Sequence, residues 1–230
     1  LGVENVIESA RANNIKKVLF TSSDKAVNPT NVMGTTKLMG ERLFTAANAM
    51  RQGGGTIFSS TRFGNVTGSR GSVIPIFLDQ IASGADLTLT DARMTRFFMT
   101  LYEAVELLLE SMVLARSGEV FVTKMPSARI SDLASVMRRD LTPCFGQSPD
   151  QIKIVETGVQ PGEKMMEELV NFEEIRRSYE DDKFVIILPA IRNIYHAIEY
   201  EYPNSIERLT RHYTSDTEEL MSEDDISVFL

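Results

Sequence analysis

The sequence is poor in the residue types that build disulfides and metal sites. It holds one cysteine, Cys144, and two histidines, His196 and His212, among 230 residues, and it has no tryptophan. A single cysteine excludes an intrachain disulfide and is typical of a reducing compartment, so we expect a cytoplasmic protein. Neither histidine has ligand partners at metal-binding spacing, so we expect structural roles for both and no metal site.

Positive charge and long apolar runs are also scarce. The chain has 24 Lys and Arg against 32 Asp and Glu, a net charge of −8. Phosphate-rich partners need a basic surface, so nucleic acid is excluded as an expected partner. No apolar run reaches the roughly 20 residues that span a bilayer, so we expect no membrane insertion.

Apolar residues follow two periodicities that alternate along the chain. Helical spacing predicts helices at 2–13, 29–50, 73–82, 102–115, 130–139 and 163–170. Short β-branched and aromatic runs predict strands at 18–20, 56–63, 87–90, 96–100, 119–123, 152–155 and 184–188. Glycines 53–55 break the second helix, and the acidic end of the chain reads as a loose tail. The alternation indicates an α/β fold with a mostly parallel, layered sheet.

One stretch concentrates the chemically useful groups. A buried strand at 18–20 runs into a polar turn with Asp24 and Lys25, and the next helix carries Met33 and Lys37 one turn apart. Open α/β sheets place their chemistry at the carboxyl ends of strands. Read alone, Asp24-Lys25 also fits an ordinary solvated turn.

Several motifs occur in a fixed order. They are S-S-D-K-A-x-x-P-x-N-x-M-G-T-T-K at 22–37, R-F-G-N-V at 62–66, G-S-R-G-S-V-I-P at 68–75, T-R-F at 95–97 and P-G-E-K at 161–164. With these motifs the sequence resembles the extended short-chain dehydrogenase/reductase superfamily. Within it, the chain is similar to the UDP-N-acetylglucosamine 4,6-dehydratases of capsule and glycan biosynthesis, over about residues 1–170.

The resemblance implies NAD-dependent dehydration of UDP-GlcNAc to a UDP-4-keto-6-deoxy-hexosamine. Ser23 would hydrogen-bond the sugar 4-hydroxyl, and Lys37 would bind the nicotinamide ribose. We assign Lys25 as the base that removes the C5 proton and Asp24 as the acid that helps the C6 hydroxyl leave. Met33 stands where the superfamily usually has a tyrosine base, as in a Ser-Met-Lys branch of these dehydratases. Either Asp24 or a water would then take the 4-hydroxyl proton.

Further ligand contacts are implied by the same resemblance. The expected cofactor contacts, to NAD rather than NADP, are Ser22, Lys37 and Arg62. The expected contacts to the UDP-sugar are Asn65, Arg70, Ser72, Val73, Arg93, Arg96 and Glu163. Guanidinium groups suit phosphate oxygens, but a surface salt bridge is an equal alternative for each of Arg70, Arg93 and Arg96. The loop 64–71 also resembles a dinucleotide phosphate loop, although its spacing is GxxxGxxG rather than GxGxxG.

The predicted strands and helices do not include the first half of a dinucleotide-binding domain. We predict a partial Rossmann-like, doubly wound domain at residues 1–66 with the catalytic strand and helix. Residues 67–230 would form mainly a smaller C-terminal UDP-sugar lobe, with returning Rossmann elements and an acidic tail. We expect little or no activity from these 230 residues alone. Helices 2–13 and 29–50 resemble the pair that packs across dimers in the superfamily, so we expect a homo-oligomer.

Two other functions fit the same residues. A UDP-sugar epimerase on this scaffold would use the hydride steps but would have little need of Asp24-Lys25. A non-catalytic nucleotide-sugar-binding module would account for Met33 and the missing cofactor loop.

Overall fold

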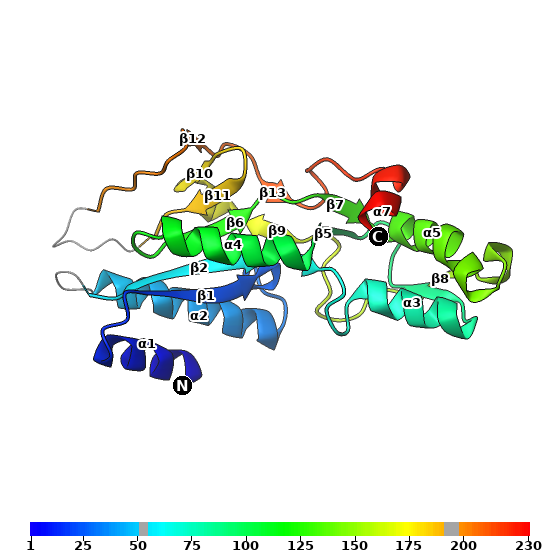
Figure 1. Cartoon of the computed structure of the whole chain (residues 1–230), viewed down its shortest axis with the longest axis horizontal. Coiled ribbons are helices and arrows are strands. Elements are labelled where there is room, and N and C mark those ends of the chain that lie inside the picture. Colours follow the sequence, from blue (N-terminus) through cyan, green and yellow to red (C-terminus); the bar gives the residue numbers. More distant parts are fainter. Residues whose placement is uncertain (51–54, 191–197) are drawn as a thin grey trace. The chain divides into compact units, whose positions relative to one another are not determined.

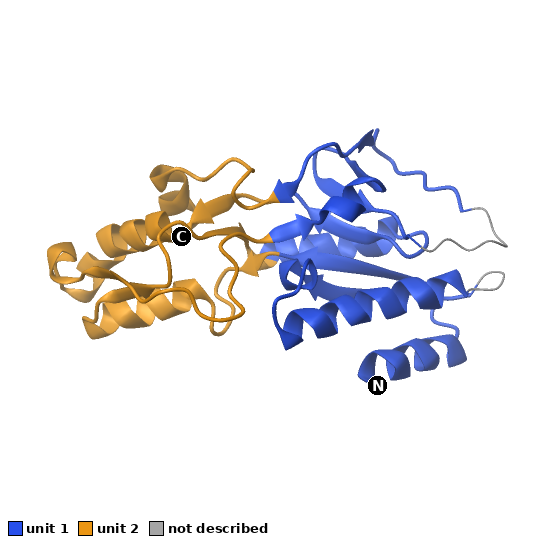
Figure 2. Ribbon diagram, turned by 180° about the vertical axis from the view of Figure 1, so that it is seen from behind, with its two compact units in different colours: residues 1–63, 102–124, 168–213 blue, residues 64–101, 125–167, 214–230 orange. Residues whose placement is uncertain are grey.

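The computed structural model describes residues 1–50, 55–190 and 198–230. The predicted helix break at Gly53 and Gly54 and the structural role predicted for His196 therefore lie outside the described residues. The chain divides into two compact units (Figure 2). Unit 1 comprises residues 1–63, 102–124 and 168–213, and unit 2 comprises residues 64–101, 125–167 and 214–230. Each unit is made of three separate segments of the chain, whereas the sequence predicted a single domain boundary, after residue 66.

Unit 1 is built on a mixed sheet (Figure 1). In its described part, six strands lie in the order β1-β2-β6-β11-β10-β12. Their bounds are β1 Lys17–Ser23, β2 Ile57–Phe63, β6 Val120–Thr123, β11 Phe184–Ile187, β10 Ser178–Glu180 and β12 Glu207–Arg208. Strands β1, β2 and β6 are parallel, and the remaining strands add antiparallel. This confirms the predicted α/β fold with a parallel-strand sheet.

Helices cover one face of the sheet at its β1–β2 end. Helix α1 (Gly2–Ala12) and helix α2 (Val32–Ala49) bury apolar side chains against β1 and β2. Ile7, Phe44 and Phe58 form the centre of this cluster, and Val18 packs against it. A turn of 3-10 helix, η1 (Asp24–Ala26), joins β1 to α2. The carboxyl end of β1 is thereby held between the sheet and α2.

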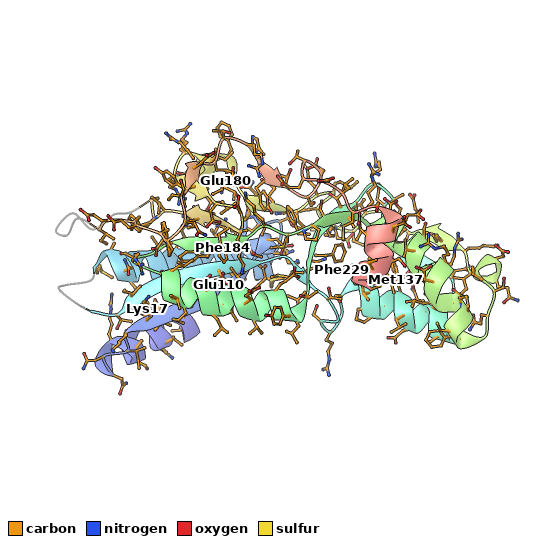
Figure 3. The ribbon with its side chains drawn as sticks, turned by 45° about the horizontal axis from the view of Figure 1, so that its top comes forward. Lys17, Glu110, Met137, Glu180, Phe184 and Phe229 are labelled. Atoms are coloured by element: carbon orange, nitrogen blue, oxygen red, sulfur yellow. The ribbon has the colours of Figure 1, made fainter. Side chains whose placement is uncertain are left out.

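The helix α4 (Leu101–Leu114) lies on the opposite face. Lys17 is next to Val18 in β1, so their side chains point to opposite faces of the sheet. The Lys17 Nζ, labelled in Figure 3, donates to the carbonyl oxygens of Met112 and Val113, both at 2.9 Å. These are carbonyls of the last turn of α4, where a cation is favoured. Lys17 therefore links the C-terminal turn of α4 to strand β1.

Three further short elements complete unit 1. Helix α6 (Phe172–Ile175) follows strand β9 (Glu168–Val170), which pairs with β13 (Tyr213–Thr214). The helix predicted at 163–170 is wrong, because its first residues form a loop and its last three are β9. The Met and Glu residues there are good helix formers, but the pairing with a distant strand overrides that preference.

Unit 2 is a smaller α/β assembly with its own core. Its strands are β3 Asn65–Val66, β4 Leu87–Leu89, β5 Thr95–Met99, β7 Ser127–Arg129 and β8 Ile154–Glu156, and its helices are α3 Val73–Ser83, α5 Ile130–Leu141 and α7 Glu223–Phe229. The short turns η2 (Thr142–Phe145) and η3 (Pro149–Gln151) follow α5. Phe77, Ile81, Leu133 and Met137 are buried together between α3 and α5.

The acidic end of the chain is folded rather than loose. Ser222 caps α7 through a reciprocal capping box with Asp225. Ile226 is fully buried, and the Phe229 ring lies 6.3 Å from the Phe98 ring (Figure 3). The acidic residues of the first turn face the positive end of the helix dipole. Ile226 and Phe229 therefore pack this segment against unit 2, although its acidic composition predicted a loose tail.

Candidate active site

Two side-chain caps shape the turn that follows β1. The Ser23 Oγ accepts a hydrogen bond from the Lys25 backbone N–H at 3.1 Å. The Asn31 Oδ1 accepts one from the Gly34 backbone N–H at 2.9 Å and so caps α2. Such caps supply acceptors to N–H groups that a first helical turn leaves without partners. The hydroxyl of Ser23 uses only a lone pair here, so its O–H can still donate to a ligand.

Asp24 is fully buried at the start of η1. Its Oδ1 accepts two hydrogen bonds from Lys25, one from the backbone N–H at 2.8 Å and one from Nζ at 3.0 Å. Its Oδ2 is buried and has no hydrogen-bond partner among the described residues, and the same holds for Ser22 Oγ. An unsatisfied buried acceptor costs roughly 1–3 kcal/mol. A ligand or water that donates to Asp24 Oδ2 would recover that free energy.

The two other predicted catalytic residues lie on the first turns of α2. The Lys37 Nζ donates to the Thr21 carbonyl at 2.9 Å and lies 5.4 Å from the Phe20 ring centre. An ammonium has three N–H donors, so Lys37 can still serve a ligand. The Met33 side chain is about half exposed one turn earlier, and its thioether has no proton to transfer.

Helix α2 approaches the turn too closely for a side chain at Gly34. A Cβ at this position would lie 2.2 Å from the Lys25 carbonyl oxygen and 3.0 Å from the Pro29 Cβ. The backbone of Lys25 and the first turn of α2 are therefore in direct contact. Position 34 therefore admits only glycine without a shift of α2 or of the Lys25 backbone.

The side chain of Arg62 is held entirely by groups of unit 1. It is fully buried, and its Nε and Nη2 donate to the Glu41 carboxylate at 2.9 and 2.7 Å. Its Nη1 and Nη2 donate to the Glu174 carboxylate, both at 2.8 Å, and Nη1 also donates to the Leu169 carbonyl at 2.8 Å. All five guanidinium N–H donors are thus used within the protein. The prediction that Arg62 contacts the cofactor is not supported, because no donor remains for it.

The buried pairs shift the protonation equilibria of their members. Burial alone would raise the pKa of Glu174, but the charge and hydrogen bonds of Arg62 outweigh it and lower the pKa to about 2. Burial likewise opposes the charge on Arg62, yet both carboxylates raise its pKa well above the usual value. Arg62 and Glu174 are therefore both ionised at neutral pH.

The predicted sugar-nucleotide contacts at 65–73 lie in unit 2. Asn65 begins β3, and Val73 is the first residue of α3. The Ser72 Oγ is turned back to donate to the Ser69 carbonyl at 2.7 Å. Arg70 is exposed, and the structure gives its guanidinium no hydrogen bond or ion pair within the described residues. Of this group, Arg70 and Asn65 keep polar side-chain atoms for a ligand.

Arg93 forms a surface salt bridge, which is the alternative weighed for it. Its Nε and Nη2 donate to the Asp91 carboxylate at 2.9 and 2.6 Å. These hydrogen bonds lower the pKa of Asp91 to about 2. Arg93 is largely exposed, so a ligand phosphate would have to compete with that carboxylate.

Arg96 and Glu163 are used to shape the loop before β9. Arg96 Nη1 donates to the Thr95 carbonyl at 2.7 Å and Nη2 to the Lys164 carbonyl at 2.8 Å. The Glu163 Oε2 accepts from the Gln160 backbone N–H at 3.0 Å, although its side chain is exposed. Arg96 therefore supports the loop rather than presenting its donors outward.

The predicted site residues are thus divided between the two units. Unit 1 brings together Ser22, Ser23, Asp24, Lys25, Met33 and Lys37 on β1, η1 and α2. Unit 2 holds Asn65, Arg70, Ser72, Val73, Arg93, Arg96 and Glu163. Sequence reasoning missed Glu41, Glu174 and the hydrogen bond from Asn28 Nδ2 to Glu168 Oε2 at 2.9 Å. The position of Glu41 four residues after Lys37 was the only local signal for any of them.

The described residues offer neither a metal site nor a membrane-spanning helix. No group of three or more His, Cys, Asp or Glu side chains there is placed to hold a metal ion. None of the helices in residues 1–50, 55–190 and 198–230 is both long and apolar enough to cross a bilayer.

Comparison with known proteins places this site in a family. Residues 1–189 match the family described as polysaccharide biosynthesis protein. The chain belongs to this family. This confirms, at the level of the family, the resemblance to nucleotide-sugar enzymes of the extended short-chain dehydrogenase/reductase superfamily.

Curated relatives carry different names within the polysaccharide biosynthesis family. An uncharacterized membrane protein of Methanocaldococcus jannaschii is 48% identical over 81% of this chain and 56% of its own length. A UDP-N-acetylglucosamine 4,6-dehydratase (inverting) of Campylobacter jejuni is 39% identical over 83% of this chain and 54% of its own. A UDP-glucose 4-epimerase of Rickettsia felis is 42% identical over 77% and 50%. The chain spans about half the length of these relatives.

A solved member of the fold aligns with nearly the whole chain. The structure of Pen from Bacillus thuringiensis superposes with a TM-score of 0.88 at 41% identity, over 99% of this chain and 65% of that chain. The likeness to this solved structure therefore extends beyond residue 189, where the family match ends.

Proposed function

We propose that this chain carries the catalytic residues of a NAD-dependent UDP-N-acetylglucosamine 4,6-dehydratase. The observation on which the proposal rests is the Asp24–Lys25 pair at the end of β1. There an amine lies 3.0 Å from one oxygen of a buried carboxyl group whose other oxygen has no partner among the described residues. The Campylobacter jejuni relative with the dehydratase name supports this choice.

The reaction breaks four bonds of one sugar and forms two new ones. C4 loses its hydroxyl proton and a hydride, C5 loses a proton, C6 loses hydroxide as water, and C6 finally gains the hydride while C5 is reprotonated. A bound nicotinamide supplies the hydride acceptor for the first step and the hydride donor for the last. Lys37 fits such a group because its ammonium keeps N–H donors for a ribose hydroxyl. Ser22, with a buried and unpartnered Oγ, is the other unit 1 residue that we assign to it.

The Asp24–Lys25 hydrogen bond supplies both the acid and the base. Moving the shared proton from Lys25 Nζ to Asp24 Oδ1 turns an ion pair into a neutral amine beside a carboxylic acid. The amine can then take the C5 proton, which the C4 ketone has made acidic, while Asp24 protonates the leaving C6 hydroxyl. Ser23, whose O–H can donate, holds the C4 oxygen, and a water takes the 4-hydroxyl proton. That proton passes to Lys25 once C5 has been reprotonated, which restores the Asp24–Lys25 ion pair.

The proposed contacts to the nucleotide diphosphate are residues of the segment 65–73. Asn65, Arg70, Ser72 and Val73 would face the UDP diphosphate, because an arginine fork and backbone amides both suit phosphate oxygens. Hydrogen bonds within the protein already occupy the side chains of Arg93, Arg96 and Glu163. We therefore propose only secondary contacts to the UDP-sugar for these three residues.

We also propose a homo-oligomer through α1 and α2. Val6 of α1 and Met39 and Met50 at α2 are 50%, 58% and 67% exposed, an apolar surface that a second copy would cover. Light scattering would then give a mass above that of one chain. Met39→Glu should lower that mass, and no change in the Met39→Glu mass would contradict the proposal.

The test is product analysis by NMR after the full-length protein is incubated with UDP-GlcNAc and NAD. The proposal expects a 4-keto-6-deoxy product, with C5 deuterium incorporation in deuterated water. Asp24→Asn should lower the dehydration rate at least about 10²-fold, whereas Asp79→Asn, an exposed aspartate of α3, should not change it. Full dehydration by Asp24→Asn would overturn the assignment.

The second candidate is a UDP-sugar 4-epimerase, which is favoured by the Rickettsia felis relative. In that case the product would keep its C6 hydroxyl and change only at C4, without exchange at C5. Binding of UDP-sugar without any product would instead favour a non-catalytic binding module.

A further inference from the structure

Three buried charged side chains form one connected group in unit 1. Glu41 of α2, Arg62 of β2 and Glu174 of α6 are 2%, 0% and 1% exposed. We call these three residues the arginine cluster. The guanidinium of Arg62 lies between the two carboxylates and is bidentate to each. Bidentate pairs fix direction as well as distance, so the cluster holds its three elements in one relative orientation.

The cluster touches both sides of the catalytic turn without entering it. On one side Glu41 lies one helical turn after Lys37 on α2. On the other side, Arg62 holds the Leu169 carbonyl of β9. The neighbouring residue in β9, Glu168, accepts from Asn28 in the loop that follows Lys25. One side chain therefore ties together the helix that carries Lys37 and the strand that supports the Asp24–Lys25 turn.

Close packing of α2 against β1 and η1 makes the position of Lys37 depend on the position of Glu41. A Cβ at Gly40, beside Glu41, would lie 2.4 Å from the Phe20 ring, and the corresponding contact at Gly34 is with the Lys25 carbonyl. Helix α2 thus sits against β1 and η1 with no spare room. A displacement at Glu41 moves Lys37 along β1 instead of being absorbed by a gap.

We propose that Glu41, Arg62 and Glu174 are positioning residues that keep Lys37 in register with the Asp24–Lys25 pair. This inference rests on the function proposed above for those three residues. The arginine cluster acts through α2 and β9 and touches no reacting atom. The cluster has one more carboxylate than guanidinium groups, and two further arginines, Arg177 and Arg42, lie 3.7 and 3.9 Å from Glu174.

The choice of arginine is required by the geometry. The cluster uses five donors arranged in one plane toward two carboxylates and a carbonyl. A lysine has three donors on a single nitrogen and cannot reach both carboxylates in a bidentate manner. Arg62→Lys therefore keeps the positive charge but loses the bidentate hydrogen bonds that orient Glu41 and Glu174. The variant distinguishes a positioning role of Arg62 from a role in neutralising the two carboxylates.

The experiment compares Arg62→Lys with Arg208→Lys in the whole protein. Arg208 is exposed and donates to the Arg176 carbonyl, so its variant is a matched control. Arg62→Lys should lower kcat about 10²-fold, the usual cost of a misplacement near 1 Å, with little change in the KM for UDP-sugar. Arg208→Lys should leave both unchanged. If Arg62→Lys does not fold, Glu41→Gln, which keeps the side-chain shape, takes its place. An unchanged kcat in the folded cluster variant would overturn the inference.

A second readout does not depend on turnover. Lysines can be methylated with ¹³C, and the Lys37 signal, assigned with Lys37→Arg, reports its distance from the Phe20 ring. This signal should shift in Arg62→Lys and stay in place in Arg208→Lys. If the wild-type protein shows no dehydration, the proposed function fails, and the Lys37 signal still decides whether the cluster positions the helix. An unchanged Lys37 signal in Arg62→Lys would contradict the inference.

Discussion

Replacing Gly34 by alanine tests how α2 is seated on the catalytic turn. The new Cβ would lie 2.2 Å from the Lys25 carbonyl oxygen, whereas ordinary contact begins at 3.4 Å, so the backbone must move by about 1 Å. Alanine gains up to about 1 kcal/mol over glycine in a helix. Overpacking against a backbone atom costs about 1–3 kcal/mol. We therefore expect a net destabilisation of roughly 1–2 kcal/mol.

The matched control is Gly2→Ala at the start of α1. Nothing lies within 4 Å of a Cβ at Gly2, so only the helix preference remains and stability should stay the same or rise. Urea denaturation of the three proteins gives the comparison, because a lower midpoint at constant slope reports lost stability. The rate of dehydration should also fall about 10²-fold in Gly34→Ala. A Gly34→Ala protein at least as stable as Gly2→Ala would refute the reasoning.

Three further predictions concern stability. The pKa of Glu174 is lowered from 4.5 to about 2 in the folded protein. The stabilising contribution of its carboxylate is therefore complete above about pH 4.5 and is lost as the pH falls toward 2. Denaturation midpoints measured across this pH range should fall less steeply for Glu174→Gln than for the unchanged protein. Lys17→Met should cost about 0.5–1 kcal/mol by removing the cation from the end of α4, measurable by thermal unfolding against Lys16→Met. Asn31→Ala should cost about 1 kcal/mol through the lost cap of α2, and Asn31→Ser, which can still cap, should restore most of the midpoint.

Local patterns were enough to predict the elements around the site. The strand predicted at 56–63 is β2 (Ile57–Phe63), and the helix predicted at 29–50 is α2 (Val32–Ala49). The strand is a β-branched and aromatic run, the helix has apolar residues at helical spacing after Asn28-Pro29, and glycines follow both elements. The juxtaposition of Asp24 and Lys25 was also predictable, since adjacent residues need no tertiary information to meet.

The contacts of Arg62 could not be predicted in the same way. Its carboxylate partners lie 21 and 112 residues away in the sequence. Within the motif at 62–66 an arginine at a strand end looks like a ligand contact, because guanidinium groups often bind phosphates. Only the packing of β9 and α6 against α2 shows that its donors are already in use.

The loop and strand at 163–170 show a second limit. Met165, Met166 and Glu167 favour a helix by intrinsic preference, yet they form a loop whose carbonyls accept from Arg96. Strand β9 exists because β13 supplies a partner more than forty residues later. Non-local pairing of this kind leaves no periodic trace in a short segment.

The arginine cluster also limits how this protein can have evolved. A lineage that lost Arg62 alone would keep two buried carboxylates without their counter-ion, at a cost of about 3–5 kcal/mol. That is a large part of the roughly 5–15 kcal/mol by which a typical domain is stable. Positions 41, 62 and 174 should therefore be inherited together or exchanged together across the family.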